Sequence, residues 1–146
     1  MKLDLINKRL LKELQANARI SNTELGRRIG ISSPAISERL KKLEDLGLIK
    51  GYGAQISYQD LGYQLKAIIT LKAFMGKLKP FLEKVVTYKE VINCYRVTGN
   101  ENIVMEVVLK NQAHLEKLID ELITYGECKT QVVLSKVVDN NPIVPA

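Results

Sequence analysis

The sequence has little of what most catalytic and metal centres require. Its 146 residues include one histidine, His114, and two cysteines, Cys94 and Cys128, neither of which sits in a paired spacing such as C-x-x-C. This composition argues against a disulfide framework and a cysteine-based zinc site, and it fits a reducing cytosol. A lone histidine also argues against a histidine-rich metal site and most Ser-His-Asp chemistry. We therefore expect no enzymatic activity, no cofactor and no metal site.

Long apolar runs are also missing. No stretch approaches the ~18 apolar residues of a membrane span, and the start Met1-Lys2-Leu3-Asp4 does not resemble a signal peptide. Hydrophobic residues make up 46% of the chain and charged residues 26%, which is ordinary for a globular protein. A chain of this length buries roughly 70% of its unfolded surface on folding, enough for one ordinary domain or two small ones. We expect a cytoplasmic protein without a membrane partner.

Positive charge is in excess, mostly in the first two-fifths of the chain. The net charge is +6, from 22 Lys and Arg against 16 Asp and Glu. Residues 1–60 hold 11 basic and 7 acidic residues, whereas residues 61–146 hold 11 and 9. Contacts between basic side chains and phosphates release counterions, so this bias favours a polyanionic partner. A solvated surface that promotes solubility explains the charge equally well at this point.

The first thirty residues predict two helices. The first begins after Asp4, a good N-cap, and ends between Gln15 and Ala18, with leucine and isoleucine recurring every three or four residues. The second is opened by residues 21–24, Ser-Asn-Thr-Glu, which have the spacing of a capping box. Gly30 is expected to end this helix.

A third helix is expected from about Ser33 to Leu46, with Pro34 in its first turn and Gly47 after its end. A short helix, a glycine-containing turn and a longer helix make a helix-turn-helix unit, whose second helix enters the major groove of DNA. The residues that we expect to contact DNA are Arg27, Arg28, Ser32, Ser33, Pro34, Ser37, Glu38, Lys41, Lys42 and Lys50. A three-helix bundle without a DNA-binding role has a similar polar face and remains an alternative.

The expected DNA contacts divide by chemistry. The small and polar groups at the start of the third helix suit base readout, and the cations Arg27, Arg28, Lys41 and Lys42 suit anchoring to phosphates. Lys50 lies in a stretch that reads as a wing or hinge strand, residues 48–57, where a solvated lysine at a strand edge is an alternative. Arg39 projects beside the apolar side of the helix, and it either touches DNA or pairs with an acid inside the domain.

The pattern changes after Leu61, where strands and helices alternate. The expected elements are a strand over 65–74, a helix over 78–86, strands over 91–98 and 103–109, a helix over 115–123 and a strand over 130–138. This β-α-β-β-α-β order is that of the ferredoxin-like split βαβ fold, so the fold class is α+β. We divide the chain into a DNA-binding domain (1–50), a hinge (51–63), a second domain (64–139) and a loose tail (140–146).

One face of the expected sheet has no helix to cover it. The apolar residues from which this face would be built are among Ile68, Ile69, Val104, Val108, Val132 and Val133. Exposing so apolar a face to water is unfavourable, so we expect a second copy of the chain to cover it in a dimer.

Several short segments together resemble the Lrp/AsnC, or leucine-responsive and feast/famine, family of transcription factors. The matching residues are Asp4, Leu10, Leu11 and Leu14, then 17–21 (NARIS), 24–26 (ELG), 30–34 (GISSP), 39–44 (RLKKLE), 47–52 (GLIKGY) and 61–62 (LG). With the second half, the resemblance covers nearly the whole chain. It implies a winged helix-turn-helix that binds specific double-stranded DNA, followed by an effector-sensing domain of the RAM type. It also implies nucleoid association, and dimers that assemble as tetramers or octamers.

The resemblance further implies an amino-acid effector. By position, its site would comprise Gly99, Asn100, Glu101 and Asn102, in the turn between the central strands, and Thr130, near the expected start of the last strand. Many members have Asp where Asn102 stands, and Asp is the stronger acceptor for an ammonium group. A different effector, or none, is therefore an alternative.

Two other functions are weighed against sequence-specific regulation. An architectural protein that wraps DNA with little sequence preference would share the same motifs. A small enzyme built on the ferredoxin-like half would need a catalytic cluster or phosphate loop that the sequence does not offer.

Overall fold

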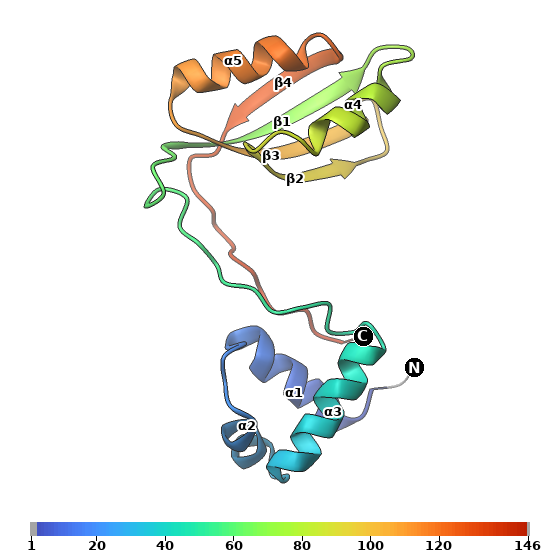
Figure 1. The fold of residues 1–146 in the computed structure, drawn as a ribbon, viewed down its shortest axis with the longest axis vertical. Helices are drawn as coiled ribbons and strands as arrows, with labels where there is room; N and C mark the ends of the chain where they lie inside the picture. Colours follow the sequence, from blue (N-terminus) through green and yellow to red (C-terminus); the bar gives the residue numbers. More distant parts are fainter. Residues whose placement is uncertain (1–2, 146) are drawn as a thin grey trace. The chain divides into compact units, whose positions relative to one another are not determined.

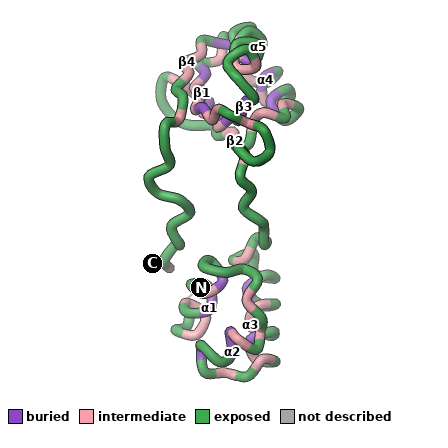
Figure 2. Tube along the Cα trace, turned by 90° about the vertical axis from the view of Figure 1, so that its left-hand side faces the viewer, coloured by how far each residue is buried: buried purple, intermediate pink, exposed green. Residues whose placement is uncertain are grey.

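The computed structural model describes residues 3–145, and these form two compact units (Figure 1). One unit is Met1–Gln55 together with Val138–Ala146, and the other is Ile56–Val137. Met1, Lys2 and Ala146, at the ends of the predicted DNA-binding domain and tail, lie outside the described residues. Within the described part of the chain, the helices are too short or too polar to cross a bilayer. Buried residues gather inside each unit (Figure 2).

The first unit contains the expected helices, α1 (Leu5–Ala16), α2 (Asn22–Ile29) and α3 (Ser33–Asp45). Each begins at a side-chain cap that its own sequence supplies. The carboxylate of Asp4 accepts the amide N–H of Asn7 at 2.7 Å, and the hydroxyl of Ser21 accepts that of Glu24 at 3.1 Å. The hydroxyl of Ser32 accepts the N–H of Ala35 at 3.4 Å at the start of α3.

The turn between α2 and α3 is held by a close backbone contact. Gly30 ends α2 with a φ of +88°, a left-handed conformation that favours glycine. The carbonyl of Gly26 accepts N–H groups from Gly30 at 2.8 Å and from Ile31 at 3.0 Å. A Cβ atom at Gly26 would lie 2.4 Å from the carbonyl oxygen of Ile31, so only glycine fits there. The buried side chains around this turn are Leu10, Leu14, Leu25, Ile29, Ile36 and Leu43.

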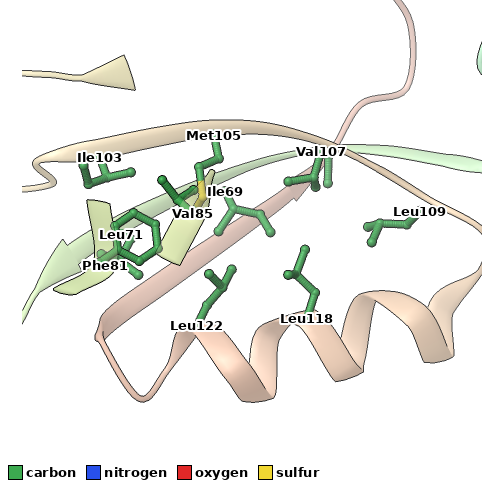
Figure 3. Close-up of a cluster of buried hydrophobic side chains, with 11 residues drawn as sticks. Ile69, Leu71, Phe81, Val85, Ile103, Met105, Val107, Leu109, Leu118 and Leu122 are labelled. Carbon is green, nitrogen blue, oxygen red and sulfur yellow. The ribbon is translucent and has the colours of Figure 1, made fainter. Parts of the chain in front are cut away.

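The second unit has the predicted βαββαβ order. Its elements are β1 (Leu65–Ala73), α4 (Leu78–Val85), β2 (Val91–Arg96), β3 (Ile103–Leu109), α5 (Gln112–Leu122) and β4 (Gly126–Val132). The strands pair antiparallel in the order β2-β3-β1-β4, and α4 and α5 cover one face of the sheet (Figure 1). Leu118 and Leu122 of α5 point toward Ile69 of β1 in the core (Figure 3).

Two residues assigned to the uncovered face lie on the other side. Ile69 is fully buried in the core beneath the helices, and Val132 pairs with Ala67, which is also fully buried there. Directly paired residues share a face, and neighbours along a strand alternate. The other residues of the predicted set, Ile68, Val104, Val108 and Val133, lie on the uncovered face as expected.

The last strand begins earlier than predicted, at Gly126 rather than near residue 130, and ends at Val132 rather than Val138. Gly126 pairs with Ala73 at the end of β1. Opposite it, the backbone of β1 approaches so closely that a Cβ atom at Gly126 would lie 2.3 Å from the carbonyl oxygen of Lys72. This glycine is thus the first residue of a strand whose partner is distant in sequence.

The expected wing or hinge strand over residues 48–57 does not form in the described part of the chain. This stretch has no neighbouring strand with which to pair. Its start is held instead by the N–H of Leu48, which donates to the carbonyl of Leu43 at 2.9 Å. Further along, the hydroxyl of Tyr52 donates to the carboxylate of Glu44 at 2.7 Å.

Replacing Gly26 with alanine tests the close contact in the turn. Alanine has a better helix propensity by up to about 1 kcal/mol. The clash is with backbone, however, so no side-chain rotation relieves it, and overpacking costs about 1–3 kcal/mol. We expect Gly26→Ala to lower the free energy of unfolding, measured by urea denaturation. Gly53→Ala is the matched control, since a Cβ there meets nothing within 4 Å. Equal effects of the two substitutions would contradict this account.

Candidate nucleic-acid interface

Helix α3 has one buried and one exposed side. Ile36 and Leu43 are buried, at 0% and 1% exposure, and they pack against α1 and α2 in the core of the unit. The predicted contacts Pro34, Ser37, Glu38, Lys41 and Lys42 are exposed. At 100° per residue these positions fall on one side of the helix. The structure therefore brings together, on one accessible face, most of the residues predicted to meet DNA.

Arg39 holds α3 against the start of α1. Its Nη1 atom lies 2.6 Å from the carboxylate of Asp4 and 2.9 Å from the amide oxygen of Asn7. The amide N–H of Asn7 and the Arg39 guanidinium together hold the pKa of Asp4 below its usual value. Of the two roles considered for Arg39, the structure shows the pairing with an acid.

Arg27 and Arg28 are engaged with acidic side chains rather than standing as free cations. Arg27 donates two bonds to the carboxylate of Glu24, at 2.7 and 2.8 Å. Arg28 donates to Glu24 at 2.8 Å and to Glu13 at 2.8 Å. Hydrogen bonds from Arg27 and then Arg28 lower the pKa of Glu24 to about 2. These pairs reduce the net positive charge that the arginines offer, although each fork keeps donors for a phosphate.

The lysines among the predicted DNA contacts differ from these arginines. Lys41, Lys42 and Lys50 are exposed, and no carboxylate of the described residues forms an ion pair with them. Ser33 is half-buried in the first turn of α3. Ser32 is exposed, but its hydroxyl oxygen already caps the helix.

Two contacts that support this face were not found from the sequence. The guanidinium of Arg9 donates to the last carbonyls of α2, that of Arg28 at 2.8 Å and that of Ile29 at 3.4 Å. Tyr52 reaches back to Glu44 near the end of α3, and burial together with this bond raises the pKa of Tyr52 to about 12. A basic residue facing a helix C-terminus was the available signal for Arg9. Arg9 lies on α1 but caps α2, and the sequence alone does not show that these two helices meet in this way.

The predicted effector residues lie between β2 and β3, except Thr130. Gly99 takes a φ of +115° in this connection. The side-chain oxygen of Asn102 accepts the N–H of Ala73 at 3.1 Å, which ties the turn to the end of β1. The carboxylate of Glu101 forms an ion pair with Lys129 of β4. The hydrogen bond from Lys129 is the main reason that the pKa of Glu101 is lowered, and the same bond raises the pKa of Lys129.

Thr130 is not brought to the turn. It pairs with Ile69, on the side of the sheet that the helices cover, in the middle of β4. Lys129, which is not among the predicted effector residues, points to the opposite side and meets Glu101. Neighbouring residues of a strand point to opposite faces, so Thr130 lies on the helix-covered side while the adjacent Lys129 reaches Glu101.

Comparison with known proteins identifies both units. Residues 3–50 match the family model for winged helix-turn-helix DNA-binding domains, and residues 66–143 match the Lrp/AsnC ligand binding domain. The chain belongs to the Lrp/AsnC family. It is a DNA-binding transcriptional regulator, as the resemblance implied, with an α+β fold that joins a winged helix-turn-helix to a ligand-binding half.

Individual proteins show how far this likeness extends. The leucine-responsive regulatory protein of Rhizobium meliloti is 35% identical over 130 residues, which cover 87% of this chain and 83% of that protein. The solved structure of LrpC from Bacillus subtilis has a TM-score of 0.89 at 28% identity, covering 94% of this chain and 99% of that one. The NMB0573/L-Met complex from Neisseria meningitidis has a TM-score of 0.91 at 23% identity, covering 97% and 96%, and shares the fold.

Proposed function

We propose that the exposed face of α3 reads specific DNA sequences from the major groove. One observation carries the proposal: unpaired Lys41 and Lys42 stand on the same accessible face as Pro34, Ser37 and Glu38. The close turn at Gly26 and the ion pair of Arg39 with Asp4 hold this helix in the unit, so the face is presented by a rigid support. The protein would work in the cytoplasm, at the nucleoid.

The contacts divide between affinity and discrimination. Lys41, Lys42 and Lys50 would supply most of the sequence-independent attraction, because their charges are not compensated within the chain. Arg27 and Arg28 would add less, since both already pair with Glu24. The side chains expected to discriminate between bases are Ser33, Pro34, Ser37 and Glu38, with Ser32 placed beside them as the helix cap.

Charge reversal at Lys41 tests this division. We expect Lys41→Glu to weaken binding to every duplex by a similar factor and to reduce the salt dependence of binding by about one phosphate contact. Ser37→Ala should instead cost about 1–3 kcal/mol on the target site alone. Both are measured by fluorescence anisotropy at several salt concentrations, on target and random duplexes. Lys12→Glu, an exposed charge reversal on α1, is the control.

The results of these measurements distinguish a sequence-specific regulator from an architectural protein. A loss at Lys41 confined to one sequence would contradict the assigned roles. If no substitution on α3 distinguishes target from random DNA, and footprints lack half-sites about one helical turn apart, the wrapping function is favoured instead.

We also propose that the protein dimerises through the uncovered face of the sheet, with further assembly to tetramers or octamers. Val104 and Ile68 are half-buried at its centre, and Tyr95 beside them is 51% exposed. Next to them a polar group is already satisfied within the chain: Glu106 accepts from Asn93 at 2.5 Å and lies 3.7 Å from the ammonium of Lys66. This face can therefore be buried without leaving that charge unpaired.

A carboxylate at Val104 should break this dimer. We expect Val104→Glu to shift sedimentation toward the monomer, because the new charge would be buried without a partner. Ile123→Glu is the matched control, since Ile123 is 49% exposed at the end of α5, on the helix-covered side. An unchanged sedimentation profile for a folded Val104→Glu variant would refute dimerisation through this face.

We propose that an amino acid binds at the corner formed by Gly99, Asn100, Glu101 and Asn102 together with Lys129. The paired carboxylate and ammonium of Glu101 and Lys129 match, with opposite sign, the two charged groups of a zwitterion. The solved structure of the Neisseria protein, which shares this fold, is a complex with L-methionine. L-methionine is therefore the first amino acid to test.

Ligand-induced stabilisation measures this binding. A binding amino acid should raise the melting temperature as its concentration exceeds the dissociation constant, and should change occupancy of target DNA. Glu101→Gln and Lys129→Met should abolish the shift, whereas Lys79→Met on the exposed surface of α4 should not. If no amino acid in a complete panel moves either quantity, the amino-acid effector is ruled out.

A further inference from the structure

A largely apolar groove lies on the first unit, and its lining includes the predicted DNA contact Lys50 but no residue of α3. Its volume is ≈ 680 Å³, and it runs between α1, which contributes Leu11 and Leu14, and the segment Leu48–Gly53. Among the described residues, those that line it come from α1, from the segments beside it and from the end of the chain, but none from α2 or α3. An occupant of this groove would therefore leave the exposed face of α3 free.

The C-terminal end of the chain is seated on this groove through Gln15. The side-chain oxygen of Gln15 accepts the amide N–H of Ile143 at 2.7 Å, and its Nε2 donates to the carbonyl of the same residue at 3.1 Å. A carboxamide that bonds both main-chain groups of one residue recognises extended backbone whatever the side chain. Pro145 and Ile143 also line the groove. The tail, expected to be loose, is thus held at this point.

The sequence of the tail favours this docking. Pro142 and Pro145 fix their own φ angles near −65°, and each proline pushes the residue before it, Asn141 or Val144, toward extended backbone. A segment that is already extended loses less conformational entropy when it binds. The side chain of Ile143 contributes little burial, because the residue remains 81% exposed. The two hydrogen bonds to Gln15 are therefore the main attachment.

We propose that residues 140–145 are a strap that docks along the edge of this groove and forms one of its walls, and that Gln15 is the residue that holds it. The chain enters the second unit at Ile56 and returns to the first after Val137. A docked strap gives the DNA-binding unit a second attachment besides residues 51–55, at high effective concentration because both belong to one chain. This inference is independent of which DNA or effector is bound.

Hydrogen exchange of the full-length protein tests the strap directly. In Gln15→Ala, we expect the amide of Ile143 to exchange about tenfold faster, the factor that follows from losing one to two net hydrogen bonds. Gln15 is exposed on α1, so the variant should fold normally. Lys12→Ala, an exposed substitution on the same helix outside the groove, should leave the exchange of Ile143 unchanged. The amide of Gln64, which bonds to Leu109 in the second unit, is the internal reference.

A second variant addresses the strap rather than the groove. Replacing both Pro142 and Pro145 with glycine keeps the partners of Gln15 but makes the tail flexible, so we expect the amide of Ile143 to exchange several-fold faster. Exchange at the rate of an unstructured peptide in the wild-type protein would overturn the proposal. An unchanged rate in Gln15→Ala, with the Gln64 reference also unchanged, would overturn it equally.

Discussion

The backbone contact at Gly26 sets the geometry on which the DNA-binding unit depends. The carbonyl of Ile31 occupies the space where any other residue would place its Cβ, so the turn can pack directly onto α2. That contact fixes where α3 starts, and the buried Ile36 and Leu43 then fix its rotation about its own axis. The exposed face follows from these two constraints. On this face, Pro34, Ser37, Glu38, Lys41 and Lys42 need only be small, polar or basic, because none of them belongs to the buried core that holds the helix.

Pairing among charged side chains decides which cations are available to a polyanion. Several arginines of this unit are used internally: Arg9 caps α2, Arg28 joins α2 to α1, and Arg39 joins α3 to α1. A planar guanidinium suits such bidentate and multiple contacts better than an ammonium does. Lysines remain on the outside of α3. Net charge alone pointed to a polyanionic partner, but only the structure separates the charges that stabilise the unit from those left to attract phosphate.

Local signals made most of the fold predictable, and contacts distant in sequence made the rest unpredictable. The helix caps at Asp4 and Ser21 and the limits of β3 follow from residues within one turn or one strand. The early start of β4 depends on the approach of Lys72 to Gly126, which no local pattern shows. The candidate sites show the same division. The exposed face of α3 can be predicted from helical periodicity, whereas the pairing of Lys129 with Glu101 can be predicted only when the register of β4 is known.

The surroundings of Asn102 explain why a neutral side chain suits this position. Its oxygen accepts the N–H of Ala73, a bond that the carboxylate of an aspartate could also make. An aspartate, however, would add a further negative charge directly after Glu101, whose carboxylate is already paired with Lys129. With asparagine, the corner keeps the Glu101–Lys129 pair together with Lys72 and Glu127, which act on that pair electrostatically, so two carboxylates face two ammonium groups. An effector bound there would exchange one set of opposite charges for another, which favours a zwitterion over a simple anion or cation.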